Sequence, residues 1–185
     1  MDFLELAQNR RSYRGPYLPD PVPREALRRM LEAGLAAPSG CNKQTTSLLA
    51  LDDPAVLAKV TPLLEHPGFS SAPAAICVLT RRIIAYRDRC YQVQDYAAAI
   101  ENILLEIAAQ GYASCWVEGH ITDVDRIGRR MADLLGVPQE YELVAYLPVG
   151  LPAQQASRAA KKPFEERAWF NGFGLPESRA IPSVP

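Results

Sequence analysis

The chain lacks the short motifs that identify the commonest nucleotide-binding and hydrolytic domains. It contains no GxGxxG fingerprint after its first predicted strand, no GxxxxGK[ST] phosphate loop and no GxSxG nucleophile turn. Its carboxylates are scattered over predicted helix faces, without the facing pair that glycoside hydrolysis needs. These absences argue against a Rossmann dinucleotide site, a P-loop enzyme and a serine hydrolase. If the chain is an enzyme, we expect a bound cofactor to supply the reactive atoms.

Metal-binding and disulfide-forming residues are also scarce. The chain has only two histidines, His66 and His120, and no spacing of His, Cys and Asp that resembles a zinc site. Its cysteines form no CxxC pair, and two of them lie in apolar, strand-like segments; they are Cys41, Cys77, Cys90 and Cys115. We therefore expect no metal centre, and reduced, mostly buried thiols in a cytoplasmic protein.

Neither a strong net charge nor a long apolar run is present. The 20 Lys and Arg residues balance 21 Asp and Glu residues to a net charge of −1, which argues against a dedicated nucleic-acid binder. No apolar run approaches the ~20 residues of a membrane span, and the acidic N-terminus has no signal-peptide pattern. The 185 residues are enough for one well-buried domain. The prediction is a cytoplasmic protein that binds neither membranes nor nucleic acid.

Hydrophobic periodicity predicts alternating helices and strands up to Gly150. The predicted helices span 2–9, 23–36, 91–110 and 124–135, the last with Asp123 near its start, and the predicted strands span 47–51, 74–79, 114–117 and 143–147. The helix over 91–110 has a wide apolar stripe and is expected to be central. After Gly150 the pattern ends, and residues 151–185 combine prolines with aromatic residues. We expect this tail to lie over a surface such as that of a partner subunit.

Arginine is concentrated in one short segment, Arg10-Arg11-Ser12-Tyr13-Arg14, of an otherwise neutral chain. Such a cluster repels itself unless an anion or solvent neutralises it. Arginine forks match phosphate oxygens and a serine hydroxyl adds a donor, so one interpretation is a phosphate site. The other is the solvated, charged end of a helix, and this segment alone leaves both open.

Three more segments combine small, polar or charged residues near the ends of predicted elements. Residues 37–44 (APSGCNKQ) permit close backbone approach and offer amide and hydroxyl donors, or form an ordinary helix-to-strand turn. Residues 116–119 (WVEG) end a predicted strand, where backbone amides often meet ligands, or are a plain strand terminus. Residues 161–166 (KKPFEE) supply two lysines, or belong to a solvated tail.

These four segments, in this order and spacing, resemble the nitroreductase family of FMN-dependent oxidoreductases. The resemblance includes residues 99–105 (AIENILL) leading to 111–116 (GYASCW), and it spans nearly the whole chain. It implies an α+β, three-layer fold with a central, mostly antiparallel sheet flanked by helices. It also implies an FMN-binding core over 1–150 and, within the same domain, an arm over 151–185 that is exchanged across a homodimer.

The resemblance implies roles for particular residues in FMN binding. Arg10, Arg11 and Ser12 would hold the phosphate and ribityl chain, together with a lysine of the Lys161-Lys162 pair. Arg14 would lie near the flavin pyrimidine, where a fixed cation stabilises the charge of reduced flavin. Pro38, Ser39, Gly40 and Asn42 would come from the other subunit, with Gln44 a further cofactor-binding candidate, and backbone amides near Glu118 and Gly119 would face the isoalloxazine.

The implied function is an FMN-dependent NAD(P)H oxidoreductase that reduces a small electron-poor acceptor, such as a nitroaromatic or a quinone. Reducing equivalents would pass through flavin N5 in a ping-pong cycle, and no side chain is assigned as catalytic. Two alternatives stay open. One is specialised flavin chemistry on one metabolite, such as dehydrogenation or reductive dehalogenation, and the other is a non-enzymatic flavin-binding protein.

The sequence departs from the family pattern in the region expected to form the substrate pocket. Gln44-Thr45-Thr46 stands where the family usually has Gln-Pro-Trp, and the loss of a large aromatic is expected to leave the pocket more open and polar. The segment over 81–95 is short, and its Tyr86 and Tyr91 either line the pocket or pack internally. Cys41, close to the expected flavin edge, is either redox active or a small space-filling residue.

Overall fold

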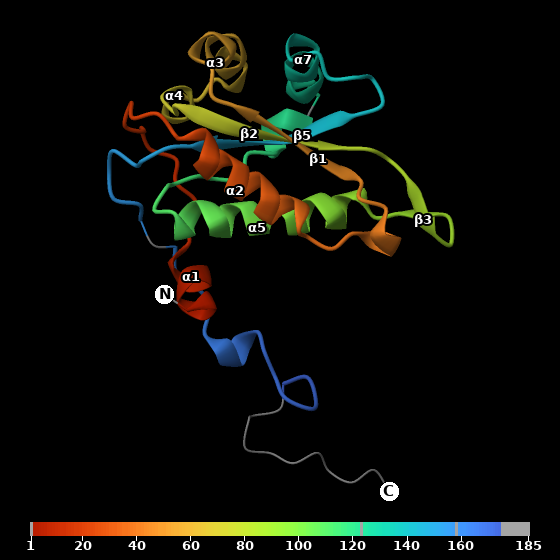
Figure 1. Cartoon of the computed structure of the whole chain (residues 1–185). Coiled ribbons are helices and arrows are strands. Elements are labelled where there is room, and N and C mark those ends of the chain that lie inside the picture. Colours follow the sequence, from red (N-terminus) through yellow and green to blue (C-terminus); the bar gives the residue numbers. More distant parts are fainter. Residues whose placement is uncertain (1, 123, 158, 175–185) are drawn as a thin grey trace, which may run out of the picture.

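The computed structural model describes residues 2–122, 124–157 and 159–174, and Figure 1 shows how their elements are arranged. The helices are α1 (Phe3–Asn9), α2 (Arg24–Leu35), α3 (Pro54–Val60), α4 (Pro67–Ser70), α5 (Gln92–Ala109), α6 (Gly119–Thr122) and α7 (Ile127–Leu134). The strands are β1 (Thr46–Leu51), β2 (Ala74–Thr80), β3 (Ile84–Tyr86), β4 (Arg89–Cys90) and β5 (Glu142–Val149). Short 3-10 helices are η1 (Gly40–Asn42), η2 (Thr61–Leu64) and η3 (Phe164–Glu166).

The central sheet has the strand order β1-β2-β5 with both pairings antiparallel. In its register Leu49 lies opposite Cys77, and Cys77 lies opposite Tyr146. An irregularity between Val78 and Leu79 shifts the pairing of β2 with β5 by one residue. The predicted α+β class with an antiparallel sheet is thereby confirmed.

The sheet separates two hydrophobic cores, which gives the molecule three layers. Side chains along β2 alternate: Ala74, Ile76 and Val78 pack toward α2 and α5, whereas Ala75, Cys77 and Leu79 pack toward α3, α4 and α7 (Figure 1). Every residue of β2 is buried, as expected for a strand covered on both faces. Gly34 lets α2 approach α5 closely, because a Cβ at this position would lie 2.6 Å from Ile103 Cγ1.

The predicted helices over 2–9, 23–36 and 91–110 and the predicted strands over 47–51, 74–79 and 143–147 are confirmed within two residues at each end. The predicted strand over 114–117 is wrong, because Ser114 and Val117 each form only an isolated bridge, to Ser12 and to Tyr146. The helix expected over 124–135 begins at Ile127, after Arg126 in a left-handed conformation, and Asp123 lies outside the described residues. The β3–β4 hairpin was not predicted.

Residues 151–174 follow an extended path after β5 with little structure of their own. Pro152 bridges Tyr17, and the Ala153 amide donates to the Pro16 carbonyl oxygen, so the first part stays on the core. The chain then passes α1 and leads away from the sheet (Figure 1). Phe173 is 88% exposed, although its ring lies 4.1 Å from that of Trp169. Within the described ranges, no helix has the length and apolar character needed to cross a membrane.

Candidate anion-binding site

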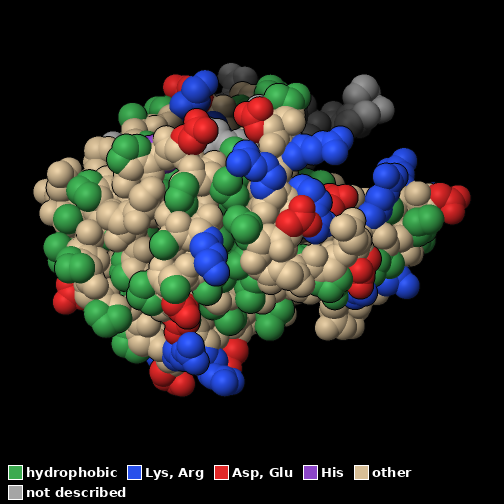
Figure 2. All heavy atoms as spheres, turned by 90° about the horizontal axis from the view of Figure 1, so that it is seen from above, with side chains coloured by type: hydrophobic (Ala, Val, Ile, Leu, Met, Phe, Trp, Pro, Cys, Tyr) green, Lys and Arg blue, Asp and Glu red, His purple; other side chains and the backbone are tan. Residues whose placement is uncertain are grey.

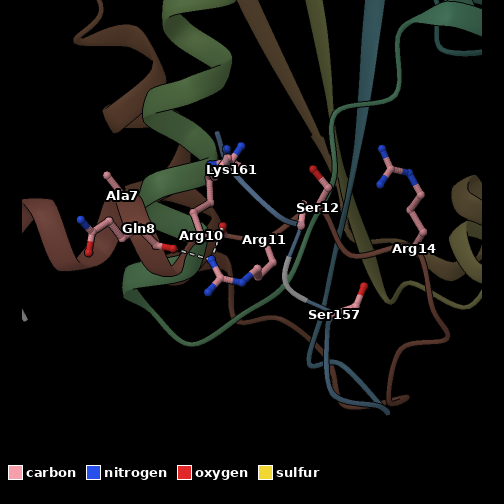
Figure 3. Close-up of a pocket in the computed structure, with 9 residues that line it drawn as sticks. Ala7, Gln8, Arg10, Arg11, Ser12, Arg14, Ser157 and Lys161 are labelled. Atoms are coloured by element: carbon pink, nitrogen blue, oxygen red, sulfur yellow. Dashed lines mark hydrogen bonds between the residues drawn. The ribbon is translucent and has the colours of Figure 1, made fainter. Parts of the chain in front are cut away.

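A cavity of about 440 Å³ opens where the end of α1 meets the chain that follows β5. Its lining residues are Ala7, Gln8, Arg10, Arg11, Ser12, Arg14, Ser157, Ala159 and Lys161. In Figure 3, Arg10, Arg11 and Lys161 lie on one side of Ser12, and Arg14 lies on the other. The fold therefore brings the N-terminal arginine cluster together with a lysine from the far end of the chain, an arrangement that the family resemblance implied.

The cations of this cavity differ in how far the protein itself neutralises them. Arg10 Nε donates to Glu101 Oε1 of α5 at 3.1 Å, and Arg11 Nη1 donates to the carbonyl oxygen of Arg10 at 2.9 Å. Arg14 and Lys161 form no ion pair with any residue that the structure describes. The cavity thus carries excess positive charge next to free guanidinium and ammonium donors, which suits a phosphate.

Backbone contacts fix the direction in which the cluster points. An Asp2–Glu5 capping box starts α1, which ends one residue before Arg10. The Tyr13 amide donates to the Ser114 carbonyl oxygen at 2.8 Å, and the Tyr13 ring is buried. Because side chains alternate along an extended segment, burial of Tyr13 turns Ser12 and Arg14 outward to the cavity.

Glycine at position 68 makes room for the backbone of the cluster. A Cβ on Gly68 would lie 2.5 Å from the carbonyl oxygen of Arg14, closer than any side chain tolerates. The helix α4 that contains Gly68 is therefore packed directly against the Arg14 main chain. This contact sets where the arginine side chain begins.

The loop over 38–45 lies at the other end of α5 and does not line this cavity. Asp95, buried in the first turn of α5, accepts from the Gly40 amide at 2.8 Å and from the Thr45 hydroxyl at 2.7 Å. Ser39 Oγ accepts from the Gln44 amide at 2.9 Å. The loop is therefore held by side-chain bonds to the core.

Three residues of this loop have left-handed backbone conformations, with φ of 49° at Cys41, 54° at Asn42 and 49° at Gln44. Such conformations cost about 1 kcal/mol or more for residues other than glycine, so the surrounding bonds must stabilise them. The expectation that Thr45 makes the pocket more polar is not supported, because Thr45 is 1% exposed and its hydroxyl bonds to Asp95. Cys41 is exposed, which also departs from the expectation of mostly buried thiols.

Glu118 and Gly119 lie where the chain leaves the sheet edge and enters α6. The Tyr96 hydroxyl donates to Glu118 Oε1 at 2.7 Å. Burial, followed by this bond, raises the pKa of Tyr96 above its ordinary value, so the phenol keeps its proton as a donor. The carboxylate of Glu118 is thus fixed from the core side, while Gly119 has open space around its Cα.

The structure separates the candidate residues into those gathered in one cavity and those elsewhere. Five lie together, namely Arg10, Arg11, Ser12, Arg14 and Lys161, whereas Lys162 points to Glu166 at 3.8 Å and does not line the cavity. Sequence reasoning missed Asp95. A signal was available, because Asp95 lies about one helical turn before Ala99, and a carboxylate on the buried face of a central helix needs a partner. Sequence reasoning also missed Gln8 and Ser157, for which no signal exists in the sequence.

Known proteins that are similar to this chain include flavoproteins. A protein of Archaeoglobus fulgidus named "Putative NADH dehydrogenase/NAD(P)H nitroreductase" is 28% identical over 155 residues, which span 83% of this chain and 87% of that protein. A crystal structure of a nitroreductase with bound FMN from Bacteroides fragilis is 26% identical, with a TM-score of 0.70 over 88% of this chain and 95% of that chain. A BluB-like flavoprotein from Clostridium difficile shares the fold, with a TM-score of 0.79 and 21% identity over 92% of this chain and 99% of that chain.

Fold and site together define an α+β protein of three layers with a cavity lined by basic side chains. The sequence model of the nitroreductase family matches residues 7–66 and 60–151 of the chain. These matches include the arginine cluster, the loop over 38–45 and both Glu118 and Gly119. The chain belongs to the nitroreductase family.

Proposed function

We propose that the protein is an FMN-dependent oxidoreductase that uses NAD(P)H to reduce a small electron-poor acceptor, such as a nitroaromatic or a quinone. The observation that carries this proposal is the cavity in which Arg14 and Lys161 remain without a carboxylate partner among the described residues. A phosphate monoester is the anion that such a donor set fits, and FMN has one phosphate. The relatives named as nitroreductases, one of them with bound FMN, support the choice of cofactor.

The side chains of the cavity would bind the cofactor and tune its charge. Arg10, Arg11, Ser12 and Lys161 would donate to the phosphate and ribityl oxygens, and Arg14 would place a fixed positive charge near the pyrimidine ring. Backbone amides near Glu118 and Gly119 would face the ring system. When bound, FMN would supply the N5 atom that accepts hydride from NAD(P)H and returns reducing equivalents to the acceptor.

We also propose that the working unit is a homodimer. The aromatic residues Phe164, Phe170 and Phe173 of the arm are exposed in the single chain, and burying them would stabilise an assembly. One edge of β1 is unpaired among the described residues, and beside it α2 borders an open groove of about 730 Å³ that includes Leu31 and Leu35. If the arm of one subunit lay along this surface of its partner, it would bury the aromatic residues of the arm and also cover the groove and the edge of β1.

Homodimer formation would also explain the distance between the two halves of the candidate site. The loop over 38–45 does not reach the arginine cavity of its own chain. In a homodimer, Pro38, Ser39, Gly40 and Asn42 of one subunit would complete the flavin site of the other. The positive φ values at Cys41 and Asn42 support a loop shaped for such a contact.

The visible absorption spectrum of the purified protein tests the cofactor assignment. We expect flavin bands, and release of the chromophore by heat should yield FMN rather than FAD. Protein that is colourless and does not take up added FMN would overturn the proposal. Protein that binds FMN but does not oxidise NADH or NADPH with a quinone would be a non-enzymatic flavin-binding protein.

Steady-state kinetics test the reaction scheme. Because no separate nucleotide-binding domain is evident in the sequence, NAD(P)H and the acceptor are expected to use one space above the flavin in turn. Double-reciprocal plots at several quinone concentrations should then be parallel. Intersecting lines would indicate a ternary complex and would contradict the ping-pong scheme.

A further inference from the structure

The β3–β4 hairpin carries a second concentration of arginine, separate from the cavity described above. Residues 81–91 contain Arg81, Arg82, Arg87 and Arg89 against a single carboxylate, Asp88. None of these arginines forms an ion pair with a residue in the described ranges. Figure 2 shows Lys and Arg side chains, with Asp and Glu side chains among them, on the projecting side of the molecule where the hairpin lies in Figure 1.

Arg81 differs from the other three because it is part of the packed base of the hairpin. Its guanidinium lies 5.0 Å from the centre of the Tyr141 ring, and its side chain is half-buried. Arg82, Arg87 and Arg89 are exposed, although the Arg87 guanidinium also lies 5.1 Å from the centre of the exposed Tyr86 ring. These three, here called the hairpin arginines, are therefore the ones available to a ligand.

The two-residue turn that carries Arg87 is unfavourable by itself. Arg87 has a φ of 47° and Asp88 a φ of 59°, which are values that favour glycine or asparagine at a two-residue turn. A glycine at either position would give a more stable hairpin at the loss of a charged side chain. The turn therefore has charged residues at positions where glycine would be more stable.

The hairpin is fixed to the loop over 38–45 by two sets of contacts, at Thr45 and at Gly40. The Thr45 carbonyl oxygen accepts from the Arg81 amide at 3.0 Å, and the Thr45 hydroxyl donates to Asp95. On the same side, Gly40 packs so closely against Tyr91 that a Cβ on it would lie 2.8 Å from Tyr91 Cβ. The hairpin and the loop therefore form one unit at the N-terminal end of α5, and β3 lies against η1.

We propose that the hairpin arginines bind a phosphate or a comparable anionic group of a small-molecule substrate at the entrance to the flavin site. This inference rests on the proposed function, in which the loop over 38–45 borders the flavin. Two sources share this chemistry: the additional phosphate that distinguishes NADPH from NADH, and an acidic group on the acceptor. The reacting atoms lie elsewhere, so the hairpin arginines select substrates by affinity and take no part in the chemistry.

The expected effects follow from the exposure of the hairpin arginines. A solvent-exposed ion pair contributes modestly, so each Arg→Gln substitution should lower kcat/KM for the anionic substrate about two- to five-fold, and the triple variant on the order of tenfold. The loss should appear in KM with kcat unchanged, because ground state and transition state hold the anionic group equally. Added salt should reduce the parent preference through screening.

The test compares FMN-loaded parent protein with the single variants Arg82→Gln, Arg87→Gln and Arg89→Gln and with their triple combination. Arg130→Gln on α7 is the matched control, since Arg130 is exposed and belongs to neither arginine cluster. One arm measures kcat/KM for NADPH and for NADH with a neutral quinone. The other arm uses NADH with a neutral quinone and with its sulfonated analogue.

A fall in the NADPH/NADH ratio identifies the reductant as the source of the anion, and a fall in the sulfonated/neutral ratio identifies the acceptor. Unchanged ratios in both arms, with NADH turnover retained, would overturn the inference and leave the proposed function intact. Failure of the parent protein to oxidise NADH and NADPH would instead contradict the proposed function.

Two further measurements keep the inference independent of folding and of turnover. Arg87→Gly removes the charge and suits the left-handed turn, so its melting temperature should match or exceed that of the parent while the selectivity falls. Arg87→Lys keeps the charge and should retain most of the selectivity.

Titration of FMN-loaded protein with adenosine 2′,5′-bisphosphate and with ADP, neither of which reacts, should show weaker binding of the bisphosphate in the triple variant. Equal binding of it by parent and triple variant would contradict the reductant as the source.

Discussion

Two groups of arginines lie at different places on this fold, and the core supports them in different ways. Arg10, Arg11 and Arg14 follow directly on α1 and line a cavity, with the buried Tyr13 ring and the Ser114 carbonyl oxygen holding their main chain. Of the hairpin arginines, Arg82 precedes β3, Arg87 lies in the two-residue turn and Arg89 begins β4, and the Arg81 amide joins the base of the hairpin to Thr45. One group lines a cavity beside the core, and the other lies on an exposed hairpin.

The difference indicates two kinds of ligand. A cofactor that must stay bound through many turnovers needs several donors that converge on one place, and the cavity of about 440 Å³ brings Arg10, Arg11, Ser12, Arg14 and Lys161 together. A substrate that must enter and leave benefits from exposed charges that attract it but bind it weakly. The arginine cavity therefore suits retention of a phosphate, and the hairpin suits selection among transient substrates.

The largest expected effect comes from shortening the arm, which tests whether the arginine cavity works without a partner subunit. Ending the chain after Pro163 keeps Lys161 in the cavity but removes Trp169 and Phe173. We expect dimers to be lost, since the apolar interface of the proposed dimer would lose its anchors. Light scattering after gel filtration measures the mass, and a chain ending after Gly174 is the control. A shortened chain that remains dimeric and yellow would contradict the proposed arm exchange.

The second-largest effect is expected at Asp95, which holds the loop over 38–45 and, through Thr45, the base of the hairpin. It does not line the arginine cavity. Asp95→Ala leaves the Gly40 amide and the Thr45 hydroxyl without their acceptor inside the protein, which should lower the free energy of unfolding by about 3 kcal/mol. Asp133→Ala removes an exposed partner of Arg129 and should cost less than about 1 kcal/mol. Urea unfolding of both variants measures the difference. Equal stability of the two variants would show that Asp95 does not anchor the loop.

A third prediction compares the two arginine groups in the same assay. Arg10→Ala should weaken FMN binding about 10- to 100-fold, because a hydrogen bond to a charged group contributes about 1.5–3 kcal/mol. Arg82→Gln, on the hairpin, should leave FMN affinity unchanged. Fluorescence titration of apoprotein with FMN gives both constants. Equal affinities would mean that the cavity arginines are ordinary surface charges.

Whether a feature of the two arginine groups could be predicted from the sequence depends on how far apart in the chain the contacting residues lie. The segment Arg10–Arg14 and the position of α5 were predictable, because local charge and helical periodicity report them directly. The meeting of Arg10 with Lys161, or of Asp95 with Gly40, depends on segments far apart in the chain, and no local pattern records it. The β3–β4 hairpin was missed because its turn is Arg87-Asp88, without the glycine that usually marks such a turn. The prediction of a strand over 114–117 is wrong because Ser114 and Val117 pair with different segments, each through a single bridge.

The smallest expected effect concerns Arg14, which should act on flavin chemistry more than on flavin binding. Burial raises the pKa of the nearby Cys115 thiol to about 11, and the charge of Arg14 opposes that rise, so this charge acts on groups around it. Placed near the flavin pyrimidine, the same charge would stabilise the anionic reduced cofactor. Arg14→Ala should therefore lower the two-electron potential by about 30 mV, equivalent to about 1.4 kcal/mol, while Arg14→Lys should retain most of it. Spectroelectrochemical titration of the FMN-loaded proteins gives the potentials. If Arg14→Ala keeps the parent potential but loses FMN, Arg14 belongs with Arg10 as a phosphate ligand.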